Sequence, residues 1–92
     1  MIEVKGMIHK QSISILIDSG ASNNYIDPSL VKKLHLKISK HERSWIVQLA
    51  TGTRRKVSEL VEKCPLNMNG LNTVADLNII PLGSYHVLIE MG

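Results

Sequence analysis

The residues best suited to chemistry are Asp18, Ser19 and Gly20, which directly follow the apolar run 13–17. The run predicts a strand buried on both faces, and Asp18 is the first charged residue after it. A carboxylate is costly to place against apolar surface unless it is paired or hydrogen-bonded. Asp, Ser and Gly are also preferred turn residues, so the tripeptide alone is better interpreted as an ordinary turn.

The residues around the tripeptide favour a catalytic interpretation. The stretch 15–22, with apolar residues before Asp18-Ser19-Gly20-Ala21, resembles the active-site motif of retroviral-type aspartic proteases. Residues 25–34 resemble the segment that follows this motif in proteases of Ty3/gypsy retrotransposons, and residues 76–89 are similar to their C-terminal region. The resemblance spans almost the whole chain and is closest to plant Ty3/gypsy polyproteins.

This resemblance implies a role for two groups of residues. Asp18 is expected to be the catalytic residue, with Ser19, Gly20 and Ala21 completing the active-site motif. Ala50-Thr51-Gly52 falls where these enzymes carry the tip of a flap that closes over a bound peptide. An ordinary exposed turn is the alternative interpretation of that second segment.

The composition is that of one small globular domain covering residues 1–92, with 43% apolar residues. Cys64 has no partner for an internal disulfide, and no apolar stretch approaches the length of a membrane span. We therefore expect an intracellular, cytoplasmic protein without membrane association, and the resemblance adds retrotransposon particles as a setting.

The net charge of +3 raises the question of nucleic-acid binding. The basic run Arg54-Arg55-Lys56 has no interleaved aromatic residues to stack on bases, so we interpret it as a solvated face and expect no direct nucleic-acid binding. A small nucleic-acid-binding barrel remains an alternative. The four histidines are dispersed and are interpreted as surface residues, so we predict no metal site and no cofactor.

Most of the chain has the pattern of short strands. A turn at 9–11 predicts an N-terminal hairpin, and Asn69-Gly70 is the strongest two-residue hairpin signal. Asp27-Pro28 predicts the start of a helix of about two turns, because Asp is a good N-cap and Pro suits the first helical position. Alternation predicts further strands over 36–39, 45–50, 57–61 and 71–79. These elements predict an all-β barrel or sandwich, which the resemblance narrows to a retropepsin-like closed barrel with one short helix and a flap hairpin.

A single Asp18 cannot complete the chemistry that the resemblance implies. Hydrolysis of a peptide bond by carboxylates needs one group to take a proton and another to give one. Two identical chains related by a two-fold axis supply both groups. Two carboxylates held side by side share one proton, as is general for aspartic proteases. We therefore expect a homodimer that acts on a peptide or polyprotein. The alternative is a catalytically inactive dimerisation or peptide-binding module.

The sequence departs from the family pattern at its C-terminal end. Leu88-Ile89 is followed by Glu90, where the family has a closely packed glycine, so Glu90 is expected to point outward or to strain the active-site loop. His86 stands where these retrotransposon enzymes commonly have Asp. The family continues through a short helix beyond Gly92, so we expect a truncated domain and a weak homodimer.

Overall fold

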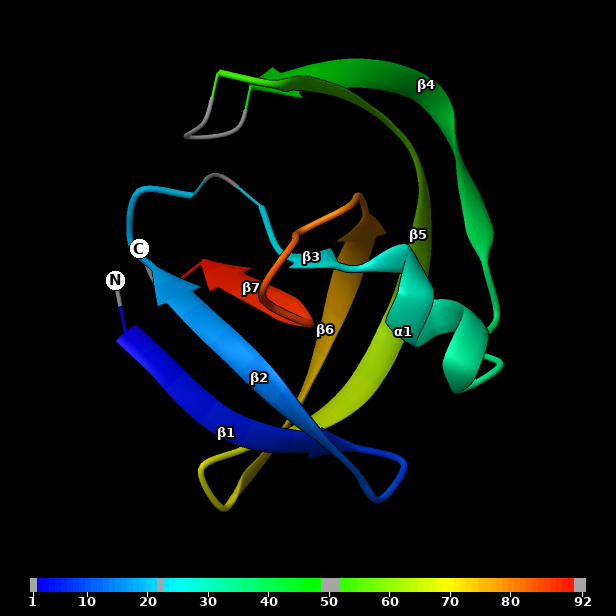
Figure 1. The fold of residues 1–92 in the computed structure, drawn as a ribbon. Helices are drawn as coiled ribbons and strands as arrows, with labels where there is room; N and C mark the ends of the chain where they lie inside the picture. Colours follow the sequence, from blue (N-terminus) through cyan, green and yellow to red (C-terminus); the bar gives the residue numbers. More distant parts are fainter. Residues whose placement is uncertain (1, 22, 49–51, 91–92) are drawn as a thin grey trace.

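The computed structural model describes residues 2–21, 23–48 and 52–90, and most of them lie in strands. The elements in chain order are β1 (Ile2–Ile8), β2 (Gln11–Asp18), β3 (Tyr25–Ile26), α1 (Pro28–Lys33), β4 (Ser39–Gln48), β5 (Arg54–Met68), β6 (Leu71–Ile79) and β7 (Val87–Glu90). The prediction of a mainly-β fold with a short helix after Asp27-Pro28 is confirmed (Figure 1).

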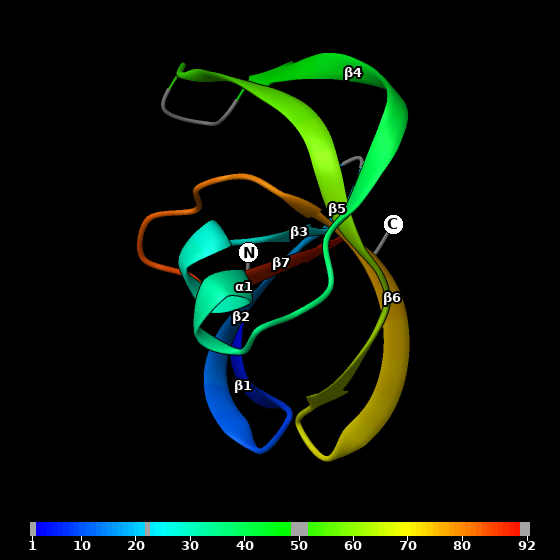
Figure 2. The same cartoon turned by 90° about the vertical axis from the view of Figure 1, so that its right-hand side faces the viewer.

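The strands form one sheet in the order β1-β2-β7-β3-β6-β5-β4. β1 also pairs with β5 through Gly6 and Met7, which closes the sheet into a barrel. The β2–β7 and β3–β6 pairs are parallel, and the other pairs are antiparallel. β4 pairs with residues 54–60 of β5, and the two strands project from the barrel as a hairpin (Figure 2).

Two tight turns set the register of the hairpins at the opposite end of the barrel. His9 and Lys10 have φ of 49° and 68°, and Asn69 and Gly70 have φ of 51° and 91°. Positive φ at both central residues is typical of type I′ turns, whose twist matches that of the flanking strands. Both hairpins are therefore those that the sequence predicted.

The closure of the barrel depends on a glycine in β1. A Cβ atom on Gly6 would overlap the backbone carbonyl oxygen of Asn67 in β5 and the side chain of Ile15 in β2. Gly6 thus lets β1 approach β5 closely enough to pair with it.

Helix α1 begins at an Asp27 that also contacts a distant loop. One carboxylate oxygen of Asp27 accepts hydrogen bonds from the N–H and hydroxyl of Ser29, at 2.9 and 2.6 Å. The other accepts one from the N–H of Leu82 at 2.8 Å. Asp27 therefore caps the helix and holds the loop between β6 and β7 against it.

The strand predicted over 36–39 was wrong for residues 36–38, because the helix ends in a way that uses these residues. His35 adopts a φ of 52°, and the N–H of Leu36 donates to the carbonyl of Val31 at 3.0 Å. The N–H of His35 donates to the carbonyl of Lys32 at 3.3 Å, which completes a Schellman motif. β4 begins only at Ser39.

Two apolar clusters hold the fold together. The larger fills the barrel and includes the fully buried Ile8, Ile15, Ile26, Leu77 and Val87. The smaller joins the β4–β5 hairpin to the barrel: its buried members are Tyr25, Val57 and Ile80, and Trp45, Val47, Leu82 and Leu88 pack against them. The base of the hairpin is therefore anchored by packing, while its far end projects beyond the barrel.

Candidate active site

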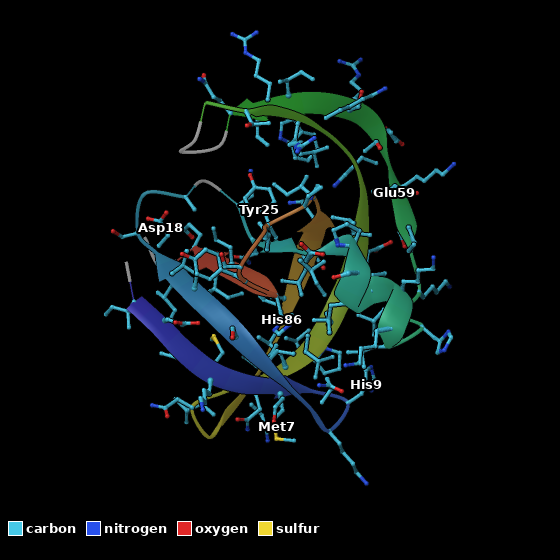
Figure 3. All side chains as sticks on the ribbon, viewed as in Figure 1. Met7, His9, Asp18, Tyr25, Glu59 and His86 are labelled. Atoms are coloured by element: carbon cyan, nitrogen blue, oxygen red, sulfur yellow. The ribbon has the colours of Figure 1, made fainter. Side chains whose placement is uncertain are left out.

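Asp18 is the last residue of β2 (Figure 3), and its side chain is half-buried. One of its carboxylate oxygens accepts a hydrogen bond from the N–H of Gly20 at 2.8 Å. Its backbone carbonyl accepts one from the N–H of Ala21 at 3.2 Å, which closes a turn. The turn that the sequence suggests is thus present, and it holds the Asp18 carboxylate in a fixed position.

The other motif residues lie in the same turn. Ser19 and Gly20 are exposed, and Ala21 is half-buried. A Cβ atom on Gly20 would lie 3.3 Å from the carboxylate of Asp18, which is tighter than an ordinary contact. A glycine at this position therefore allows the N–H to approach the carboxylate without displacing it.

The β4–β5 hairpin arches over the loop that follows Asp18 (Figure 1). Of the three residues expected at its tip, Ala50 and Thr51 lie outside the described residues. Gly52 is exposed and has a φ of 89°, a conformation that glycine adopts readily and other residues rarely do. The position of this hairpin suits a cover over a peptide bound beside Asp18.

Glu90 lies next to Asp18, in register with it across the parallel β2–β7 pair. Its N–H donates a hydrogen bond to the side-chain oxygen of Asn24 at 2.8 Å. Its side chain is half-buried and lines a polar pocket between β4, β6, β7 and the loop before β3. Glu90 is therefore accommodated in the wall of this pocket, with its backbone N–H hydrogen-bonded.

The pocket contains two residues that the sequence analysis did not select. His41 of β4 and Asn78 of β6 are hydrogen-bonded through Nε2 and Oδ1 at 2.7 Å, and the His41 ring makes an edge contact with Trp45. Asn78 is buried. A polar residue within the otherwise apolar run 77–80 is the feature of the sequence that could have identified it. The side chain of His41 is half-buried.

No second candidate catalytic or metal-binding site occurs among the described residues. They contain no group of three or more His, Cys, Asp or Glu side chains that could hold a metal ion. Burial raises the pKa of the Cys64 thiol, which makes it a poor nucleophile. Within residues 2–21, 23–48 and 52–90, no helix is long and apolar enough to cross a membrane.

Comparison with known proteins defines the class to which this fold and motif belong. The family model described as retroviral aspartyl protease matches residues 1–92, so the chain belongs to this family. The fold is similar to the retroviral protease-like domain of Ddi1 from Leishmania major, with a TM-score of 0.74 and 19% sequence identity over 98% of this chain and 71% of that one. A search of curated protein sequences found no match.

Proposed function

We propose that this chain is an aspartic endopeptidase that acts as a homodimer, with Asp18 of each protomer forming the catalytic pair. The position of Asp18 carries the proposal. In a chain of an aspartyl protease family, it ends a buried strand, its carboxylate is oriented by the Gly20 N–H, and a hairpin arches over its loop.

The mechanism follows from two carboxylates held side by side. They share one proton, so one Asp18 takes a proton from water while the other gives a proton to the peptide carbonyl oxygen. The water oxygen bonds to the carbonyl carbon and gives a tetrahedral diol. When the diol collapses, the C–N bond breaks, the first Asp18 gives its proton to the leaving nitrogen, and the second takes a hydroxyl proton back, so the pair again shares one proton. Ser19, whose side chain is exposed beside Asp18, would link the two turns of the dimer by hydrogen bonding.

The outer edge of β1 supports a dimer near Asp18. Among the described residues, β1 contacts β5 through the pairs of Gly6 and Met7 and through the Asn69 N–H to Lys5 carbonyl hydrogen bond, so residues 2–4 present a free strand edge. Ile2 is 64% exposed and lies in register with Ile17, the neighbour of Asp18. A free edge with an exposed apolar side chain favours contact with a second chain.

The substrate that we propose is an extended peptide within a polyprotein. A hairpin above a sheet suits a peptide that binds as an added strand, with its side chains in alternate pockets. The resemblance to Ty3/gypsy proteases supports a retrotransposon polyprotein and a cytoplasmic location. The alternative is an inactive module that binds peptides or dimerises without hydrolysing them.

Substitution of Asp18 distinguishes an active endopeptidase from an inactive peptide-binding or dimerisation module. Asp18→Asn should lower peptide hydrolysis by about 10²-fold or more while leaving the fold intact. Glu62→Gln, a substitution of an exposed carboxylate on β5, is the matched control and should keep full activity. A wild-type protein that binds peptides but cleaves none would establish the inactive module instead.

Mixing of chains tests the dimer. If each active centre needs one Asp18 from each chain, an excess of the Asp18→Asn chain should draw wild-type chains into inactive mixed dimers. The activity of a fixed amount of wild type should then fall as the variant is added. Activity that is unaffected by the variant would show that a single chain carries out the reaction.

A further inference from the structure

The polar pocket lined by Glu90 has a volume of about 380 Å³. Its walls include His41 and Trp45 from β4, Asp76 and Asn78 from β6, and Glu90 from β7. This volume lies within the range of about 300–1,000 Å³ that is typical of sites for drug-sized ligands, which are larger than one side chain. The pocket is therefore large enough for one side chain of a bound peptide.

The pocket lies on the side of the sheet that faces the hairpin. Side chains alternate along a strand, so Asn78 shares a face with Ile80, and Glu90 shares a face with Leu88. Ile80 and Leu88 belong to the cluster that packs against the hairpin residue Trp45. The pocket thus opens on the side where the hairpin would cover a peptide.

The pocket is also close to Asp18. Asp18 and Glu90 are register partners on adjacent parallel strands, whose backbones lie about 4.8 Å apart. Partners in a parallel pair point to the same face of the sheet, so both carboxylates belong to the hairpin side. A peptide whose scissile bond lies at Asp18 would therefore place a nearby side chain at Glu90.

One wall of the pocket is fixed by a hydrogen-bonded network. Asn78 is only 6% exposed, and its amide nitrogen donates to the backbone carbonyl of Asn24 at 3.2 Å. Its oxygen therefore faces His41, whose Nε2 must carry the proton in their 2.7 Å hydrogen bond. The edge contact between His41 and Trp45, with ring centroids 4.7 Å apart, orients the indole beside the pocket.

The charge of the pocket is negative. The side-chain oxygen of Asn24 accepts a hydrogen bond from the backbone N–H of Glu90. No hydrogen bond or ion pair to the Glu90 carboxylate occurs among the described residues. Asp76 uses one oxygen to accept the Lys63 N–H at 2.7 Å. No Lys or Arg is present among the described residues of the lining. Carboxylates beside an aromatic ring suit a cation carried on an aliphatic stem.

We propose that this pocket binds a Lys or Arg side chain of the substrate, so that Glu90 is a specificity-determining residue. This inference rests on the proposed function, because it assigns a substrate class to the same cleft. Arg is the stronger candidate, since its planar guanidinium forms paired hydrogen bonds with a carboxylate and stacks on an aromatic ring.

The test compares peptides that differ only in charge. A peptide cleaved by the protein is prepared with Arg or with neutral, nearly isosteric citrulline at each position around the scissile bond in turn. At one position, kcat/KM should be about tenfold or more higher for Arg. Glu90→Gln should reduce this ratio to near one, and the control Glu62→Gln should leave it unchanged. An equal kcat/KM for all pairs in the wild type, or a ratio that Glu90→Gln does not change, would overturn the inference.

A second measurement keeps this test separate from the test of catalysis. Trp45 is the sole tryptophan of the chain and lines the pocket, so its fluorescence reports binding without hydrolysis. The Arg peptide should change the fluorescence of the Asp18→Asn protein at lower concentrations than the citrulline peptide does. Equal binding of the two would contradict the inference, whereas hydrolysis unaffected by Asp18→Asn would contradict the proposed function.

Discussion

His86 and Ser14 are joined by a pair of hydrogen bonds that connect the start of β7 to the middle of β2. The Ser14 N–H donates to Nδ1 of the His86 ring at 2.8 Å, and the His86 N–H donates to the Ser14 carbonyl at 3.1 Å. The ring nitrogen thus takes the place of a backbone acceptor. This contact precedes the parallel β2–β7 register that brings Glu90 beside Asp18.

Removal of the His86 ring should destabilise the barrel. His86→Leu leaves the part-buried Ser14 N–H without its acceptor, and we expect a loss of about 1–3 kcal/mol in the free energy of unfolding. His86→Asn supplies a side-chain oxygen and should recover part of that loss. Urea unfolding of the three proteins measures the difference. If the Leu and Asn variants are equally stable, the hydrogen bond does not stabilise the fold.

Asp27 should make the stability depend on acidity. Burial raises the pKa of Asp27, but hydrogen bonds from the Leu82 N–H, the Ser29 hydroxyl and the N–H groups of Ser29 and Gly83 outweigh it, so the pKa lies below its ordinary 3.8. The folded state therefore gains stability that is complete above the unfolded-state pKa and is lost as the pH falls through the lower folded-state pKa.

The check is a pH series on Asp27→Asn. The amide keeps an acceptor but does not titrate, so this variant should be less stable than the wild type at pH 7 and should lose less stability between pH 5 and strongly acidic conditions. Thermal unfolding across that range compares the two proteins. Parallel curves would show that Asp27 is not the titrating group.

Two glycines offer a matched test of the hairpin. Gly52 and Gly70 have φ of 89° and 91°, and a Cβ atom on either would meet nothing within 4 Å. Gly52→Ala and Gly70→Ala should therefore each cost about 1 kcal/mol of stability through the backbone alone. Only Gly52 lies near the tip of the β4–β5 hairpin, so only Gly52→Ala should lower kcat/KM. Equal kinetic effects would contradict a role for Gly52 in covering the substrate.

Gly6→Ala should weaken the closure of the barrel. The added methyl group would overlap the Asn67 carbonyl and the Ile15 side chain, so β1 and β5 must separate. We expect a destabilisation of about 1–3 kcal/mol, which denaturant unfolding measures. Lys5→Ala changes the exposed neighbouring residue and should have little effect. A Gly6→Ala protein as stable as the wild type would show that the contact between β1 and β5 can accommodate the added methyl group.

The features predicted from the sequence are those set by neighbouring residues. Asn69-Gly70 specifies its turn through positive φ, and Asp27-Pro28 specifies a helix start through the cap and the ring of proline. The Asp18 turn is likewise local, because both of its hydrogen bonds involve residues within three positions. The resemblance supplied the topology, which periodicity left open between barrel and sandwich.

The features that could not be predicted depend on strands distant in the sequence. The parallel pairing that places Glu90 beside Asp18 joins segments separated by more than sixty residues. The His41–Asn78 hydrogen bond likewise joins β4 to β6 across the base of the hairpin. The strand predicted over 36–39 failed at residues 36–38 because a Schellman motif forms around His35, although αL conformations favour Gly or Asn.

The short pairing between β1 and β5, which we call the seam, allows the barrel to open locally. β1 is paired with β2 along its whole length, but it meets β5 at two register pairs and through the Asn69 N–H to Lys5 carbonyl hydrogen bond. Opening that line breaks few contacts and leaves the β1–β2 hairpin whole, so it costs less free energy than global unfolding. The amide protons that bridge the seam should exchange with solvent through this partial opening, well before those in the centre of β2. The barrel is therefore a sheet whose closure depends on a few hydrogen bonds between β1 and the β5–β6 hairpin.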